Sequence, residues 1–305
     1  MIKPKRLKAG DTIGVVAPAG SVDLSELTQG VERLKGMGFR VKLGGSVTKR
    51  FRYLAGTDRE RAEDLNRMVS DPEVSAIVCA RGGYGTARII PYLNQGVIAQ
   101  HPKILVGSSD VTLLLNYIRQ RFEWVTFHGP MVAPNFGKQP SMLTDTWFRK
   151  ILVEAQGQGP IRVEGVKGLS GGQAHGPVVG GCLTMLCNSL GTPYEIETDG
   201  TLLLIEDIDE APYRVDRMLT QLKAASKFRN VRGVIFGKMP GCQPPTHSSY
   251  VLEDVIRDLL ADQEFPILYG FPTGHGGEQV TLPIGIPLRI DGEAATVALL
   301  EPAVQ

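Results

Sequence analysis

The first 130 residues alternate between short apolar segments and amphipathic segments, and this alternation constrains the fold more than any other feature of the chain. The amphipathic segments carry apolar residues at helical spacing, as at Leu24, Leu27, Val31 and Leu34. The apolar segments predict strands at 12–18, 39–44, 75–80, 103–107 and 124–129. Short, mostly continuous apolar strands are typical of a parallel sheet, because both of its faces are buried. Strands that alternate with helices therefore predict an α/β fold.

The composition of the sequence changes at residues 156–176, which read "QGQGPIRVEGVKGLSGGQAHG". This segment is rich in glycine and has no long periodic pattern, so it predicts a linker between domains. The expected domains are then 1–155 and 177–305. The second domain again shows helical and strand patterns and ends in short strands, which indicates a smaller α/β domain with a mixed sheet.

Composition excludes several classes of protein. The formal net charge of +1 gives no basic footprint for nucleic acid. No stretch approaches the roughly 18 consecutive apolar residues of a membrane helix. Near the N-terminus the apolar run "IGVVA" is too short for the roughly 7–15 residues of a secretion signal, so we expect the first core strand there. The four cysteines form no C-x-x-C pair, which fits a cytoplasmic protein without disulfides.

The sequence gives no positive support for a cofactor or a metal. The glycine-rich stretch "RGGYGTAR" follows a predicted strand, but Arg88 stands where a dinucleotide fingerprint needs Gly or Ala. No phosphate-binding loop, H-E-x-x-H motif or zinc-ligand spacing is present. The glycine loop is still placed where ligands of parallel sheets bind, at the carboxyl end of a strand. A plain turn is the alternative interpretation.

A second loop, "GSSD" at 107–110, lies between a predicted strand and a predicted helix. Ser108, Ser109 and Asp110 are all good helix caps, which is one interpretation. The other is that Ser109 is a nucleophile, because an exposed serine at such a turn can use the next backbone N–H and the helix N-terminus to stabilise an oxyanion. The elbow motif G-x-S-x-G of α/β hydrolases is not matched, since its second glycine is absent.

A nucleophilic serine needs a base and an acid that orients the base. His275 lies between glycines in "TGHGG" and is a candidate base, with His128 at the end of a predicted strand as its rival. Glu206 ends the apolar run "TLLLIE" and is a candidate acid. Three neighbouring acids compete with it, namely Asp207, Asp209 and Glu210.

Seven stretches together resemble the LD-carboxypeptidase family of serine peptidases. They are "GDTIGVVAPAG", "RGGYG", "GSSDVT", "GGCLTML", "LLLIEDIDEAPYRVDRML", "GVIFG" and "FPTGHG", in the order of that family. The resemblance covers nearly the whole chain. It implies a flavodoxin- or amidotransferase-like parallel-sheet domain followed by a smaller, swivelling β/α domain.

The resemblance also implies a Ser–Glu–His triad. Its motifs place the nucleophile on Ser109 in the first domain, and the acid Glu206 and the base His275 in the second. The oxyanion would be held by the backbone N–H groups of Gly83 and Asp110. The terminal carboxylate of the substrate needs a cationic partner, for which the sequence offers Arg81, Arg88, Arg214 and Arg217.

The implied activity is hydrolysis of the L,D-amide bond that releases the terminal D-alanine from a murein tetrapeptide. The implied partners are a small muropeptide and a second copy of the chain, in cytoplasmic recycling of the cell wall, without nucleic acid, membrane, cofactor or metal. Two alternatives stay open. One is a microcin-C-immunity-type hydrolase of aminoacyl-nucleotide amides, and the other is an α/β ligand-binding protein without enzymatic activity.

Overall fold

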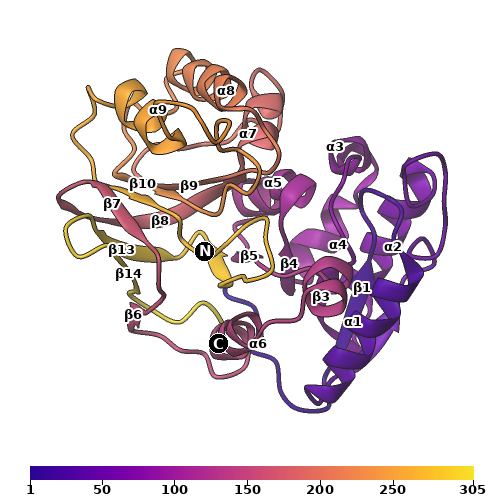
Figure 1. Ribbon diagram of the computed structural model, residues 1–305. Coiled ribbons are helices and arrows are strands. Elements are labelled where there is room, and N and C mark those ends of the chain that lie inside the picture. The colour runs from indigo at the N-terminus through magenta and orange to yellow at the C-terminus, as the bar shows by residue number, and fades with distance from the viewer. The chain divides into compact units, whose positions relative to one another are not determined.

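The computed structural model describes residues 1–305, which form two compact units (Figure 1). The first unit comprises Met1–Gln156, Gly277–Ile284 and Pro302–Gln305, and the second comprises Gly157–Gly276 and Gly285–Glu301. Each unit has its own sheet.

A six-stranded sheet forms the centre of the first unit. Its strands are β1 (Thr12–Val16), β2 (Arg40–Leu43), β3 (Val74–Cys79), β4 (Ile104–Gly107), β5 (Thr126–His128) and β12 (Leu282–Ile284). The five parallel strands run in the order β2-β1-β3-β4-β5, which is the flavodoxin-like order, and β12 pairs antiparallel with β5. The predicted α/β fold with a parallel N-terminal sheet is therefore confirmed.

Helices connect these strands. They are α1 (Leu24–Gly36), α2 (Asp58–Ser70), α3 (Thr86–Ile89), α4 (Gln95–Gln100), α5 (Thr112–Phe122) and α6 (Met142–Leu152), with 3₁₀-helices at Ile90–Tyr92 and Ser109–Val111 and a π-helix at Val132–Lys138. Helix α1 begins where the Asp23 side chain accepts from the N–H groups of Ser25 and Glu26. A capping box of Thr57 and Glu60 starts α2.

The second unit contains a mixed sheet of eight strands. They are β6 (Gly159–Ile161), β7 (Lys167–Ser170), β8 (Gln173–Cys182), β9 (Leu202–Glu206), β10 (Gly233–Phe236), β11 (Ile267–Tyr269), β13 (Pro287–Asp291) and β14 (Thr296–Leu299), in the order β6-β14-β13-β8-β9-β10-β11-β7. Strands β8 to β11 are parallel, and the outer strands are antiparallel.

Three helices cover this sheet on one side, namely α7 (Leu183–Ser189), α8 (Pro212–Ala224) and α9 (Leu252–Leu259), as Figure 1 shows. Their apolar faces pack on the parallel strands and form one buried core that includes Leu186, Leu219 and Ile256. None of the helices in the structure combines the length and the apolar character that crossing a bilayer requires.

The segment expected as a linker, 156–176, differs from that expectation. It contains β6, β7 and the start of β8, which belong to the second unit. Strand β6 pairs with β14, and β7 pairs with β11. These pairings use the backbone and distant partners, so a glycine-rich composition does not reveal them. The second expected domain also differs, because Gly277–Ile284 and Pro302–Gln305 return to the first unit.

A buried arginine joins the loops at the carboxyl ends of β1 and β3. The side chain of Arg61 on α2 is 0% exposed. Its guanidinium donates to the carbonyl oxygen of Pro18, in the loop after β1. It also donates to the carbonyl oxygen of Gly85, in the loop after β3, at 2.9 Å. It also pairs with the carboxylate of Asp58. One side chain thus holds two loops that border the same edge of the sheet.

Replacement of this arginine by Arg61→Ala should lower the free energy of unfolding by about 3 kcal/mol, because it leaves a cavity and removes the donor to a buried carbonyl group. Arg59→Ala is the matched control, since Arg59 lies on the same helix but is exposed and only contacts the ring of Tyr92. It should cost less than about 1 kcal/mol. Chemical denaturation of both variants measures the difference, and equal losses would contradict the role given to Arg61.

Candidate active site

Ser109 lies at a sharp turn between β4 and α5. Ser108 is extended and 2% exposed, whereas Ser109 is partly exposed and has a left-handed backbone, with φ of 59°. A non-glycine residue in this region is strained by roughly 1–3 kcal/mol, and such strain is concentrated at functional sites. A serine at a strained strand-to-helix turn is also the feature of a nucleophile elbow, although the glycine pattern of that motif is not matched here.

The interpretation of these residues as helix caps finds no support at Ser108 and Asp110. The side chain of Ser108 makes no capping hydrogen bond, and no side chain caps the start of α5. The carboxylate of Asp110 instead accepts from the N–H of Thr86 at 2.8 Å and from the Thr86 hydroxyl. Burial raises the pKa of Asp110, although these hydrogen bonds oppose the rise. Asp110 therefore ties the serine turn to the glycine loop after β3.

The glycine loop packs directly against Ser109. A Cβ added to Gly82 would lie 2.7 Å from the Cβ of Ser109 and 2.8 Å from its Oγ, so only glycine fits at this close approach. Gly83 follows on the same loop, and the Asp110 N–H follows Ser109. In the turns around Ser109, the N–H groups of Gly83 and Asp110 donate no backbone hydrogen bond, so both remain available to an acceptor. Asp110 is thus the neighbour of the expected nucleophile, and Gly83 follows the glycine that packs on it, while their role as oxyanion donors stays a prediction.

The second unit brings Glu206 and His275 into direct contact. Glu206 ends β9 and is 0% exposed, while the side chain of His275 is 18% exposed. One carboxylate oxygen of Glu206 accepts the backbone N–H of His275 at 2.9 Å and lies 2.7 Å from its Nδ1. A carboxylate can only accept, so the contact fixes a proton on Nδ1 and leaves Nε2 as the basic nitrogen.

The backbone before His275 is shaped around the same carboxylate. Gly274 has φ of 94°, and a Cβ there would overlap the carboxyl group of Glu206. The glycine therefore serves the close approach of the two residues, as well as the left-handed turn.

The charge of Glu206 sets the protonation of His275. Burial lowers the pKa of His275, but attraction of the imidazolium to Glu206, with smaller contributions from Asp207 and Asp209, outweighs burial and raises the pKa above its usual value. The pair therefore stabilises the charged imidazolium, as a general base requires after it has accepted a proton.

The structure separates the rival candidates from this pair. His128 ends β5 in the first unit and is 0% exposed, so it presents no solvent-facing base. Asp207 is buried and accepts from the N–H and hydroxyl of Thr184, both at 2.8 Å. Glu210 pairs with Arg214 at 3.5 Å. Of the acids considered, Glu206 is the one whose carboxylate contacts His275.

Three residues that support the serine turn were missed by sequence reasoning. Gly82 stands in the quoted "RGGYG", and its doubled glycine is the signal that points to a close approach. Thr86 and Arg61 carry no such signal, because their partners lie 24 or more residues away. No group of three or more His, Cys, Asp or Glu side chains is arranged to hold a metal ion.

Comparisons with known proteins agree over almost the whole chain. Residues 13–129 match the model of the LD-carboxypeptidase N-terminal domain, and residues 175–290 match that of the LD-carboxypeptidase C-terminal domain. A relative from Bacillus subtilis (strain 168), named as a probable murein peptide carboxypeptidase, is 40% identical and covers 99% of this chain and 95% of its own length. The murein tetrapeptide carboxypeptidase of Pseudomonas aeruginosa is 30% identical and covers 92% of this chain and 93% of its own.

A solved structure has the same fold. The microcin C7 self immunity protein MccF in complex with aspartyl sulfamoyl adenosine superposes with a TM-score of 0.95 at 28% identity, over 100% of both chains. The relatives therefore include proteins named for two kinds of substrate.

Substitution of the tightly packed glycine by Gly82→Ala should displace Ser109 and slow its reaction with a serine-directed phosphonate by roughly 10- to 100-fold, since small misplacements of reacting groups have effects of that size. Gly96→Ala is the control, because Gly96 is exposed on α4 and a Cβ there meets only ordinary contact distances. Labelling rates followed by mass spectrometry make the comparison. An unchanged rate in Gly82→Ala would show that the close approach does not position the serine.

Neutralisation of the acid by Glu206→Gln should lower the pKa of His275, because the imidazolium loses the adjacent negative charge. NMR titration of the imidazole C–H signals measures the pKa, with His275→Gln used to assign the resonance. Glu210→Gln is the control, since Glu210 pairs with Arg214 instead, and it should leave the value nearly unchanged. A pKa of His275 that is the same in Glu206→Gln as in wild type would refute the electrostatic link.

Proposed function

Because this chain belongs to the LD-carboxypeptidase family, we propose that it is a serine carboxypeptidase that hydrolyses the L,D-amide bond before the terminal D-alanine of a murein tetrapeptide. The observation that carries the proposal is the partly exposed, left-handed Ser109 at the strand-to-helix turn. The relatives named as murein peptide and murein tetrapeptide carboxypeptidases support the substrate class.

In the proposed mechanism, Ser109, His275 and Glu206 act as one catalytic triad. Nε2 of neutral His275 accepts the proton of the Ser109 hydroxyl, and Oγ attacks the carbonyl carbon of the residue before D-alanine. The N–H groups of Gly83 and Asp110 hold the developing oxyanion, and each such donor is worth about 2.7–4 kcal/mol in comparable sites.

The tetrahedral intermediate collapses when the C–N bond breaks. His275 gives its proton to the leaving amine, and D-alanine departs. Water then attacks the acyl-enzyme while His275 again accepts a proton, and the second collapse releases the tripeptide and restores the Ser109 hydroxyl. Glu206 keeps Nε2 as the reacting nitrogen and stabilises the charged ring at each step.

The microcin-immunity alternative rests on the solved complex with aspartyl sulfamoyl adenosine. An adenosine ligand favours an aromatic ring on which the purine can stack. The only two tryptophans, Trp124 and Trp147, both lie in the first unit and are 1% and 4% exposed. The second unit therefore offers no tryptophan to a purine, and we prefer the peptide substrate. A role in cytoplasmic recycling of cell-wall peptides and a homodimeric state belong to the same proposal and rest on the family resemblance.

Incubation of a murein tetrapeptide with the wild-type protein should release one D-alanine, and Ser109→Ala should reduce this rate by at least about 10³-fold, since the nucleophile is lost. Mass spectrometry of the peptide measures both rates. Ser108→Ala is the matched control, because Ser108 is the buried neighbour, and it should keep most of the activity.

Each other outcome has a separate meaning. Equal activity in wild type and Ser109→Ala would place the nucleophile elsewhere. If the wild type leaves the tetrapeptide intact but cleaves an aminoacyl sulfamoyl adenosine, the microcin-immunity alternative is correct. If it cleaves neither compound and Ser109 is not labelled by a phosphonate, the ligand-binding protein without activity is favoured.

A further inference from the structure

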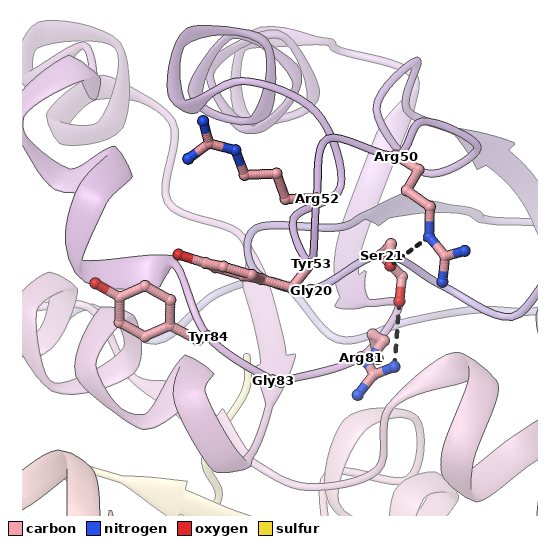
Figure 2. A pocket seen from close by; sticks show the side chains of 8 residues that line it. All are labelled: Gly20, Ser21, Arg50, Arg52, Tyr53, Arg81, Gly83 and Tyr84. Carbon is pink, nitrogen blue, oxygen red and sulfur yellow. Dashed lines mark hydrogen bonds between the residues drawn. The ribbon is translucent and has the colours of Figure 1, made fainter.

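A polar cavity of about 580 Å³ lies within the first unit, beside the glycine loop (Figure 2). The loop after β1 contributes Gly20 and Ser21, and the loop after β3 contributes Arg81, Gly83 and Tyr84. Strands β1 and β3 are neighbours in the sheet, and the strand order changes direction at this pair. The carboxyl ends of the strands at such a switch point are the usual ligand site of an open α/β sheet.

The cavity is cationic. Arg50, Arg52 and Arg81 line it, and no acidic side chain does. Figure 2 shows Arg50 and Arg81 approaching Ser21 from different loops, and Arg52 extending away from them. Arg81 donates to the carbonyl oxygen of Ser21 at 3.1 Å, and Nε of Arg50 lies 3.4 Å from the Ser21 hydroxyl. These neutral contacts orient the two guanidinium groups and leave their charge without a counter-ion.

The other arginines considered from the sequence are differently placed. Arg88 forms a salt bridge with Asp58 at 2.8 Å. Arg214 pairs with Glu210, and both Arg214 and Arg217 lie against the ring of Tyr213 in the second unit. Arg81 is thus the one of the four that lines the cavity.

Arg81 also lies next to the expected oxyanion site. Its Nη2 is 3.6 Å from the position that a Cβ of Gly83 would take, and its Nε is 3.5 Å from that of Gly20. The preceding glycine, Gly82, packs on Ser109. In a carboxypeptidase substrate the leaving nitrogen and the terminal carboxylate carbon are joined through a single Cα, so they are only about 2.5 Å apart. A cation that binds this carboxylate must therefore lie close to the reacting centre, and Arg81 is the arginine of the cavity that borders Gly83, one of the expected oxyanion donors.

We propose that this cavity is a carboxylate-binding subsite of the substrate peptide, with Arg81 as its principal ligand and Arg50 as its second. The subsite rests on the proposed function, because it takes the peptide that Ser109 cleaves. A guanidinium recognises a carboxylate through two parallel N–H donors, and Arg50 and Arg81 can each supply such a pair. The tilted rings of Tyr53 and Tyr84, whose centroids are 6.0 Å apart, form the wall beside them.

Two carboxylates of a tetrapeptide share this chemistry, that of the terminal D-alanine and that of a dicarboxylic diamino acid at the third position. Three peptides distinguish them: the tetrapeptide with that diamino acid, the same peptide ending in D-alaninamide, and the tetrapeptide with lysine at the third position. Steady-state kinetics on each peptide compare wild type with Arg81→Gln and Arg50→Gln. Arg59→Gln, an exposed arginine on α2 outside the cavity, is the matched control.

Arg81→Gln should reduce kcat/KM for the acid tetrapeptide by roughly 10- to 100-fold, the size of one hydrogen-bonded charge pair, and Arg50→Gln should reduce it less. If the subsite holds the terminal carboxylate, wild type disfavours the D-alaninamide peptide and Arg81→Gln does not. If the subsite holds the side-chain carboxylate, wild type disfavours the lysine peptide and Arg81→Gln does not.

Normal turnover by wild type together with an Arg81→Gln variant that matches Arg59→Gln on all three peptides would overturn the subsite and leave the proposed function intact. An equal loss on all three peptides would also overturn it, because the arginine would then act without regard to a carboxylate. Absence of turnover of every peptide by wild type would overturn the proposed function, and the subsite with it.

Discussion

The guanidinium of Arg61 is buried among backbone carbonyl groups that belong to two different loops, and the arrangement around the serine depends on it. An arginine removed from water needs partners for its donors, and Nη1 and Nη2 of Arg61 find them in two backbone carbonyl groups and in Asp58. The carbonyl oxygen of Gly85 accepts from the guanidinium, and the N–H of the next residue, Thr86, donates to Asp110. A continuous set of hydrogen bonds thus runs from α2 through the glycine loop to the turn that carries Ser109.

The second unit achieves the same precision by a different route. Glu206 is at the end of strand β9, which is paired with β8 on one side and with β10 on the other. Its carboxylate accepts hydrogen bonds from the backbone N–H and from Nδ1 of His275. These two bonds fix the position of the imidazole ring and its tautomer. Each unit therefore prepares its reacting group locally, the serine by backbone strain and the imidazole by a buried charge.

Much of the fold could be predicted from the sequence, because buried parallel strands and amphipathic helices leave strong periodic patterns. The linker could not, because the pairing of β6 and β7 depends on strands more than 90 residues away along the chain, beyond the range of local pattern. For the site, local reasoning left Ser109 open between a nucleophile and a helix cap, and it left His128 as a rival of His275. In the structure His128 is buried and Ser109 is partly exposed, and burial of a single side chain is a property of the tertiary fold. The carboxylate subsite could not be predicted either. Arg50 and Arg81 lie in separate loops, which come together only because of the strand order in the sheet.

The return of Gly277–Ile284 to the first sheet has a consequence for synthesis of the chain. Strand β12 pairs with β5, which is otherwise at the edge of the sheet. During synthesis, residues 1–156 leave the ribosome well before β12 does. The edge of β5 therefore stays unpaired until most of the chain has left the ribosomal exit tunnel. During that interval β5 is a template for any other extended strand. Pairing of β12 with β5 thus also covers the strand edge through which incomplete copies of the chain would otherwise associate.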